Sequence, residues 1–422
     1  MFNKLKPKSE FSSNVLTLMT GTTIAQAIPI AISPILTRIY TPEDFGIFAL
    51  YMSVATIISV VATGGYEHAI MLPKKDEDAV NIVALSVIIS CFVSFLVLLM
   101  VFVFNSQITS ILGNPEISSW LYFVPITVLF SGIYQSFNYW TNRKKYYKRL
   151  SGSKIVQSGT TVTTNLVLGF NGVGSAGLIL GSIFGQISAI FVLGKNILIQ
   201  DNKVFKNINK FKIIMFARKY IDFFKFSTFS SILNTLSFSL FTILLSKVFS
   251  IAILGFYSLI YRILTLPSAL VGNSISQVYF QESTIQKKKF GNNKNIFKVT
   301  IKKLTLISVL VYLPMYFYIE ELVIFVFGGK WHISGEIAKI LIPLMFIRFI
   351  SSVMSSTLTT YEKQKPGLFI NFILAFSVIV IFGITYTNKL GLYQFFYLYV
   401  FIMSMWYFLF LGYYYRLSKG KE

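Results

Sequence analysis

Residues 36–48 read LTRIYTPEDFGIF, and this stretch separates two long apolar runs. Arg38 closes the first run, and Thr41 precedes a proline and two acidic residues, Glu43 and Asp44. A hydroxyl side chain at the N-cap, a proline at the first helical position and acids in the first turn are typical of a helix start. We therefore predict a short turn between two helices, with Thr41 capping the second.

The whole chain is more apolar than soluble domains are. Of its 422 residues, 54% are hydrophobic and 13% are charged, and the mean hydropathy is +0.66; soluble domains are about 45–50% apolar and about 25% charged. Runs of about 20 apolar residues, the length of a membrane-spanning helix, recur along the sequence, without the polar alternation of a transmembrane β-barrel. We predict an all-α integral membrane protein with twelve transmembrane helices, at residues 14–38, 45–72, 79–104, 117–141, 150–170, 174–199, 221–246, 251–281, 300–327, 334–361, 366–387 and 391–415.

The net charge of +22 follows from topology. Most of the 38 Lys and Arg residues lie in the tails and in every second connection, on one predicted side of the membrane. Basic residues in short loops resist translocation, so this side is the cytoplasm and both termini are cytoplasmic. Nucleic acid is not indicated. The opposite side holds only Arg38, Lys247, Lys330, Lys339 and Lys389.

The opening stretch has a second copy in the middle of the chain. Residues 245–257 read LSKVFSIAILGFY and match residues 36–48 in character at an offset of 209 residues (Leu36 to Leu245). Six predicted spans precede residues 201–220 and six follow. The predicted domains are therefore a six-helix bundle at residues 1–200, a basic cytoplasmic linker at 201–220 and a second six-helix bundle at 221–422. An even number of spans in each half makes them parallel repeats, an arrangement found in transporters.

Ionisable residues inside predicted spans are costly and usually face a bundle interior or a water-filled cavity. The cations in the spans that lie on polar helix faces are Lys154, Lys225, Arg262 and Arg348, and the amides on such faces are Asn14, Gln26, Asn165 and Asn234. Small and hydroxylated residues also mediate helix packing without a ligand, and Lys225, close to an interface, is explained by snorkelling. Arg262, Lys154 and Arg348 favour a cavity that binds an anion such as phosphate. Glu67, beside His68, is a candidate for proton coupling or for pairing with a base.

Several kinds of chemistry lack their residues. There is no Walker A motif, HExxH or GxSxG, and the histidines are His68 and His332. The single cysteine, Cys91, permits no disulfide framework. The predicted external loops are too short for a catalytic domain. We therefore expect that the protein binds no cofactor or metal and has no enzymatic activity.

The N-terminal third resembles the Wzx-type polysaccharide flippases of the multidrug/oligosaccharidyl-lipid/polysaccharide exporter superfamily, through SNVLTLMTGTTIAQAIPIAISPILTRIYTPEDFGIFALY (13–51) and GGYEHAIMLPKKDEDA (64–79). The resemblance implies a MATE-like fold with a cationic central cavity and places the chain in the bacterial inner membrane. FYSLIYRILTLPSALVG (256–272) is similar to the eighth helix of related lipid-linked precursor flippases, whose arginine at the position of Arg262 faces the cavity. Arginines matching the family's cavity arginines in the first helix are absent from this sequence.

The resemblance implies a flippase that moves undecaprenyl-pyrophosphate-linked oligosaccharide repeat units for O-antigen, lipopolysaccharide or capsule by alternating access. Its expected partners are this lipid-linked glycan, membrane lipids and a polysaccharide polymerase. Two alternatives stay open: a multidrug exporter of the same superfamily, and a membrane polymerase or ligase of polysaccharide assembly. A cationic cavity disfavours an exporter of cationic drugs.

Overall fold

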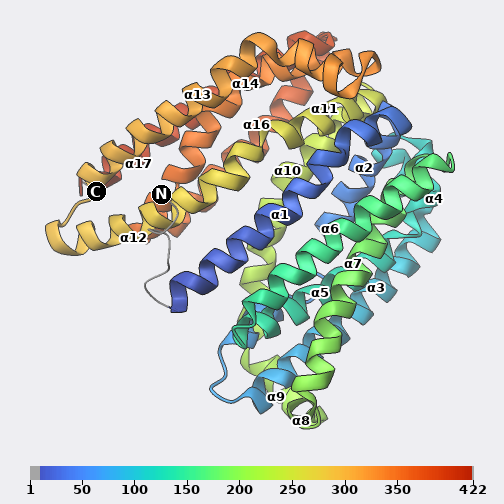
Figure 1. Ribbon diagram of the computed structural model, residues 1–422, viewed down its shortest axis with the longest axis vertical. Helices are drawn as coiled ribbons and strands as arrows, with labels where there is room; N and C mark the ends of the chain where they lie inside the picture. The colour runs from blue at the N-terminus through green and yellow to red at the C-terminus, as the bar shows by residue number, and fades with distance from the viewer. Residues whose placement is uncertain (1–9, 421–422) are drawn as a thin grey trace. The chain divides into compact units, whose positions relative to one another are not determined.

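The computed structural model describes residues 10–420; the side chains of residues 10–16, 196, 198, 226, 230, 233, 234, 237, 238 and 364 lie outside this description. Within it the chain is almost entirely helical and has no strand, which confirms the predicted fold class (Figure 1). Contacts divide it into two units, Met1–Ser239 and Leu240–Glu422. This boundary does not test the predicted division at residues 201–220, which stays a prediction.

Unit 1 contains the first six predicted spans. Its long helices are α1 (Glu10–Ile39), α2 (Pro42–Ser59), α3 (Asp76–Leu112), α5 (Val124–Arg143), α6 (Tyr147–Phe170) and α7 (Ser175–Gln200). Short segments join or follow them: η2 (Tyr66–Met71), η3 (Pro115–Ile117), α4 (Ser118–Leu121), α8 (Asn202–Phe205), α9 (Lys210–Lys219) and η4 (Phe223–Ser227). Helix α6 packs between α1 and α7, and α5 packs against α2, α3 and α7.

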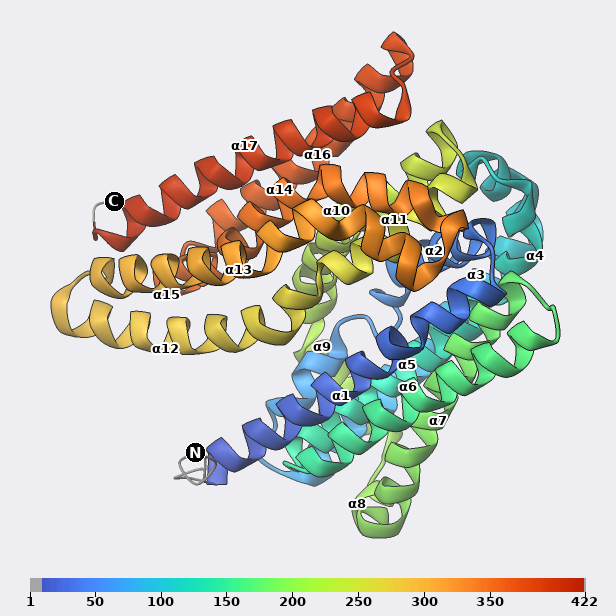
Figure 2. The same cartoon turned by 45° about the horizontal axis from the view of Figure 1, so that its top comes forward.

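Helix α10 (Thr228–Val248) runs from unit 1 into unit 2. Unit 2 continues with α11 (Ile251–Leu264), η5 (Ser268–Gly272), α12 (Asn273–Phe290), α13 (Lys294–Phe327), η6 (Gly329–Trp331), α14 (His332–Met354), α15 (Ser356–Thr360), α16 (Gln364–Asn388) and α17 (Leu392–Ser418). Helix α14 is central, because it packs against α11, α13 and α17, and α17 also packs against α16 (Figure 2).

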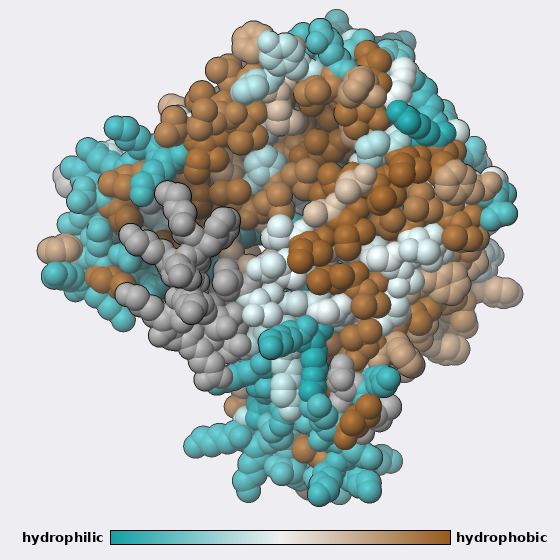
Figure 3. All heavy atoms as spheres, in the orientation of Figure 1, coloured by the Kyte–Doolittle hydropathy of each residue, from teal (hydrophilic) through white to brown (hydrophobic). Residues whose placement is uncertain are grey.

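Each of the twelve predicted spans contains a helix of the described chain. The span predicted at 45–72 is too long, because α2 ends at Ser59 and is followed by turns and the 3-10 segment η2. Eight of the described helical segments are long and apolar enough to cross a membrane, or nine if the bent pair α4–α5 is one span. The three that fall short are α2, α6 and α10, and α6 carries Lys154 and several polar residues. In Figure 3 apolar side chains cover much of the surface along the helices. Hydrophilic side chains gather around α8 and α9.

The predicted cap at the opening stretch is confirmed. The Thr41 hydroxyl accepts from the N–H of Asp44 (3.2 Å), and the Asp44 carboxylate accepts from the N–H of Thr41 (2.9 Å), forming a capping box. At the predicted offset of 209 residues, Ser250 caps α11 by accepting from the N–H of Ile253 (3.2 Å). The same hydrogen bond therefore begins the second helix of each repeat.

Loops later in the two units also correspond, at an offset of 217 residues (Lys145 to Glu362). Lys145 precedes α6 with φ 58°, and Glu362 precedes α16 with φ 57°. Both lie in the left-handed region that non-glycine residues rarely occupy. Gly174 is the N-cap of α7, and Gly391 is the N-cap of α17. The parallel repeat predicted from thirteen residues therefore extends from the second helix to the last.

Candidate substrate-binding site

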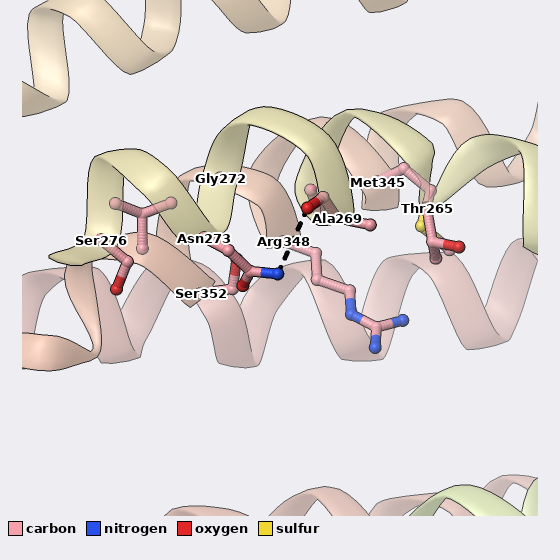
Figure 4. A pocket seen from close by; sticks show the side chains of 10 residues that line it. Thr265, Ala269, Gly272, Asn273, Ser276, Met345, Arg348 and Ser352 are labelled. Carbon is pink, nitrogen blue, oxygen red and sulfur yellow. Dashed lines mark hydrogen bonds between the residues drawn. The ribbon is translucent and has the colours of Figure 1, made fainter. Parts of the chain in front are cut away.

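A polar pocket of about 320 Å³ lies within unit 2, between the α11–α12 segment and α14 (Figure 4). The segment from Ile251 to Phe290 is one long span interrupted by the π-turn η5. Such π-turns widen a helix and are frequent at functional sites. The described residues that line the pocket include no acidic side chain; they are Thr265, Ser268, Ala269, Gly272, Asn273, Ser276, Met345, Arg348, Ser352 and Val353.

Arg348 is the cation of this pocket. Its Nη1 donates to the Tyr261 hydroxyl at 2.6 Å, and its guanidinium lies 5.4 Å from the centre of the Tyr261 ring. Tyr261 therefore orients the side chain by a hydrogen bond and a cation–π contact. The guanidinium is planar and permanently charged, and its geometry suits an anionic oxygen.

Arg262 was expected to line a cavity with the other cations, and that expectation stays a prediction. Arg262 follows Tyr261 on α11, but it is exposed and does not line the pocket that contains Arg348. Its side chain makes no hydrogen bond or ion pair with any other residue that the structure describes. The structure thus brings Arg348 together with pocket hydroxyls and leaves Arg262 on an accessible face of the same unit.

Lys154 lies within unit 1, where α6 meets α1. Its Nζ donates to the Thr22 hydroxyl at 3.3 Å. Gln26, one turn further along α1, is half-buried and lies on the same face as Thr22. The two helices approach closely at Gly21, which packs against Ser151. Lys154 is therefore a half-buried cation at a tight helix interface.

Asn165 has a packing position. It is 7% exposed, and with its amide nitrogen turned toward two carbonyls it donates to Thr161 (2.9 Å) and Gly177 (3.1 Å). Its own backbone carbonyl accepts from the Tyr40 hydroxyl at 2.6 Å. These contacts join α6 to α7 and to the end of α1.

The remaining predicted amides and cation lie elsewhere. Lys225 is exposed in the π-turn η4 and forms no hydrogen bond or ion pair with the other described residues. Asn14 and Asn234 belong to α1 and α10, and their side chains lie outside the described residues.

Glu67 is buried in η2 with 5% exposure. It accepts a hydrogen bond from Thr63, and a carboxylate oxygen lies 3.7 Å from Nε2 of His68. His68 in turn bonds the Tyr139 hydroxyl through Nδ1 at 2.8 Å. Glu67 therefore lies in a cluster with Thr63, His68 and Tyr139.

A network of charged side chains near Glu67 was not predicted from the sequence. Asp76, at the start of α3, accepts from Arg143 Nε (2.9 Å) and Lys144 Nζ (2.8 Å) at the end of α5. Lys144 also lies 3.7 Å from Asp201, which accepts from Trp140 Nε1 at 3.0 Å. The signal in the sequence was the pairing of acids at one helix start with bases at another helix end.

A second pocket was also missed. It has about 280 Å³, lies within unit 1 between α2, α5, α6 and α7, and is lined by uncharged residues that include Gln135, Gln157 and Gln186. Each glutamine comes from a different helix, so no stripe along one helix revealed the set.

Comparison with solved structures establishes the class of fold. An inward-facing multidrug resistance MATE family transporter of the MOP superfamily matches with a TM-score of 0.72 at 15% identity, over 95% of both chains. An outward-facing MATE family transporter matches with a TM-score of 0.66 at 13% identity, over 97% of this chain and 96% of that one. A MOP superfamily transporter from Pyrococcus furiosus, whose title reports a reversed polarity of the binding pocket, has a TM-score of 0.66 at 14% identity, over 97% of this chain and 96% of that one.

These likenesses define a multi-pass helical membrane protein with a MATE-like fold, here with a cationic pocket in unit 2. The family model described as "Polysaccharide biosynthesis protein" matches residues 35–336. The chain belongs to this family. No match is found among the curated proteins.

Proposed function

We propose that this protein is a flippase that moves undecaprenyl-pyrophosphate-linked oligosaccharide repeat units across the bacterial inner membrane. The observation that carries the proposal is the coincidence of a polysaccharide biosynthesis family with a cationic pocket inside a membrane-spanning unit. Arg348 binds the pyrophosphate, and Arg262 on the exposed face of α11 attracts it. The polyprenyl chain stays in the lipid.

Transport by alternating access fits this proposal. Structures with the same fold are titled inward-facing and outward-facing. Glu67, next to His68, supplies the proton-exchanging group if the cycle is coupled to protons. Both termini are cytoplasmic in this proposal, because the basic connections face that side. The protein acts by binding and moving its substrate, without catalysis, and hands it to a polymerase.

Cationic drugs are disfavoured as substrates by the same pocket. An organic cation would face Arg348 among lining residues that include no acid in the described chain. Like charges at short distance in a medium of low dielectric repel strongly.

The proposal is tested by complementation of a strain from which the gene has been deleted. We expect Arg348→Ala and Arg262→Ala to abolish surface polysaccharide at normal membrane levels of the protein, and Arg348→Lys to restore part of it. Lys302→Ala, which removes an exposed cation from the start of α13, is the matched control and should behave as wild type. Full surface polysaccharide with Arg348→Ala, or loss of drug resistance with intact polysaccharide on deletion, would contradict the proposal.

A further inference from the structure

The two pockets occupy equivalent positions in the two repeats. On the helix that follows the capped turn, the offset of 209 residues relates Thr56 to Thr265 and Ser59 to Ser268. The first member of each pair lines the pocket of unit 1, and the second lines the pocket of unit 2. One wall of each pocket is therefore the same duplicated helix.

The opposite wall is duplicated as well. The offset of 217 residues, fixed by turn residues outside both pockets, relates α5 to α14. It pairs Ser131 with Arg348 and Gln135 with Ser352, and all four line a pocket. The place of the arginine in unit 2 is thus taken by a serine in unit 1. Both repeats therefore contain a pocket at this position, but the pocket of unit 2 carries a positive charge and the pocket of unit 1 does not.

The pocket in unit 1 displays amides that the described protein leaves unsatisfied. Gln135, Gln157 and Gln186 are half-buried on α5, α6 and α7, and no described residue makes a hydrogen bond to any of their side chains. Polar residues that only join membrane helices bond across the interface, as Asn165 does between α6 and α7. All three line the pocket, and an amide without a protein partner has its donors and acceptor available to a ligand. These three therefore serve a hydrogen-bonding occupant.

The chemistry of the lining selects this occupant. Its twelve residues include no acidic, basic or histidine side chain, so neither a phosphate nor an organic cation finds a counter-charge. Each amide offers two donors and an acceptor, and the Ser131 hydroxyl offers both. The Ser182 hydroxyl donates to the Ile179 carbonyl (2.7 Å) and offers its oxygen as an acceptor. A sugar ring presents the complementary set on its hydroxyl groups. A volume of 280 Å³ lies near the lower limit of about 300 Å³ for small-molecule pockets, which suits a single ring.

We propose that the pocket within unit 1 binds a neutral sugar of the transported glycan through Gln135, Gln157 and Gln186. This inference rests on the proposed function and deepens it. In this proposal the pocket of unit 2 binds the pyrophosphate, and the pocket of unit 1 recognises the uncharged sugar. Sugar specificity is then set by three amides rather than by the arginines.

The test measures binding of two lipids to the purified full-length protein: undecaprenyl pyrophosphate with its repeat unit, and undecaprenyl pyrophosphate without sugar. We expect Gln157→Leu and Gln186→Leu to weaken binding of the glycan-bearing lipid about tenfold, since each removes a hydrogen bond worth about 1–1.5 kcal/mol, and to leave binding of the bare lipid unchanged. Arg348→Ala should weaken both. Gln281→Leu, an exposed glutamine of α12, is the control and should change neither.

The outcomes separate the two proposals. If wild type binds neither lipid, the proposed function fails and the sugar site fails with it. If wild type binds both and the glutamine variants bind them as wild type does, or lose both equally, the sugar site alone is overturned.

A second measurement avoids the Gln→Leu substitutions, so it does not depend on whether the pocket folds correctly with leucine in it. In a Cys91→Ser background, Ser182→Cys places one thiol on the pocket wall for maleimide labelling. We expect the glycan-bearing lipid to slow labelling at least fivefold and the bare lipid to have no effect. Equal protection by both lipids, or protection by sodium ions alone, would overturn the assignment.

Discussion

Arg348 and Arg262 are both cations of membrane helices, but their surroundings differ, and the proposed function gives them different roles. Arg348 is half-buried and oriented by Tyr261, so little of its freedom is lost when it binds an anion. Arg262 is exposed, and in the proposed function it acts through its charge at longer range. The sequence identified both residues, because arginine inside an apolar run is rare. It could not separate their tasks, because the hydrogen-bond partner of Arg348 lies on another helix.

Also at the residue scale, Asp76 joins two cations and is the centre of the network near Glu67. We expect Asp76→Asn to lower the free energy of unfolding by about 1–2 kcal/mol, since it weakens two charge-assisted hydrogen bonds that are partly exposed. Asp78→Asn, which affects the single ion pair of Asp78 with Lys212 (2.8 Å), should cost less. Thermal unfolding in detergent measures both; an equal or larger loss for Asp78→Asn would contradict the central position of Asp76.

The same network predicts a dependence on pH. The hydrogen bond to Asp76 raises the pKa of the Lys144 ammonium above its ordinary value. A raised pKa in the folded state stabilises the fold fully below the ordinary value of about 10.4, and this contribution is lost as the pH rises through the folded value. The stability difference between wild type and Asp76→Asn should therefore be constant from pH 8 to 10 and shrink above. A difference that grows above pH 10 would contradict this linkage.

At the scale of helices, α7 depends on glycines where it meets α6. A methyl group at Gly181 would overlap the Asn165 amide and lie 3.0 Å from the carbonyl of Thr161. We expect Gly181→Ala to lower the free energy of unfolding by about 1–3 kcal/mol through overpacking. Gly159→Ala on α6 is the matched control, because its added methyl group meets open space, and it should be neutral or stabilising by up to about 1 kcal/mol. Equal melting temperatures of the two variants would show that α6 and α7 are not held this closely.

The two helix caps test the repeat. Thr41→Ala and Ser250→Ala each remove a hydroxyl that accepts from the third helical N–H, and each should cost about 1 kcal/mol. Thr41→Ala should cost more, because the Asp44 carboxylate also bonds the Thr41 hydroxyl (3.1 Å). Chemical unfolding in detergent measures the difference. A negligible cost at Ser250 would mean that the second copy has lost the function of the cap.

Most of the twelve helices could be predicted because their apolar runs are long and are bounded by loop residues, whereas α2, α6 and α10 do not reach the length and apolarity of a membrane span. The duplication was visible in thirteen residues, since the capped turn needs the same residue types in both copies. Elsewhere in the repeats the loops between helices keep the same backbone conformation, but the residue types differ, as at Lys145 and Glu362. The side chain of Asn165, which was predicted to line a cavity, donates to Thr161 on its own helix and to Gly177 on α7, and a partner on another helix is not visible in a stripe along α6. The pocket of three glutamines was hidden for the same reason.

For the whole molecule, the central claim is that the protein moves a lipid-linked glycan between leaflets with the help of Arg348. The most direct measurement uses vesicles that contain the purified protein and undecaprenyl-pyrophosphate-linked repeat units, with an impermeant reagent that oxidises sugars in the outer leaflet. With wild type, nearly all of the glycan should become accessible, whereas with Arg348→Ala, at equal protein content, only the glycan of the outer leaflet should react. The same accessible fraction with wild type as in vesicles without protein would contradict the claim.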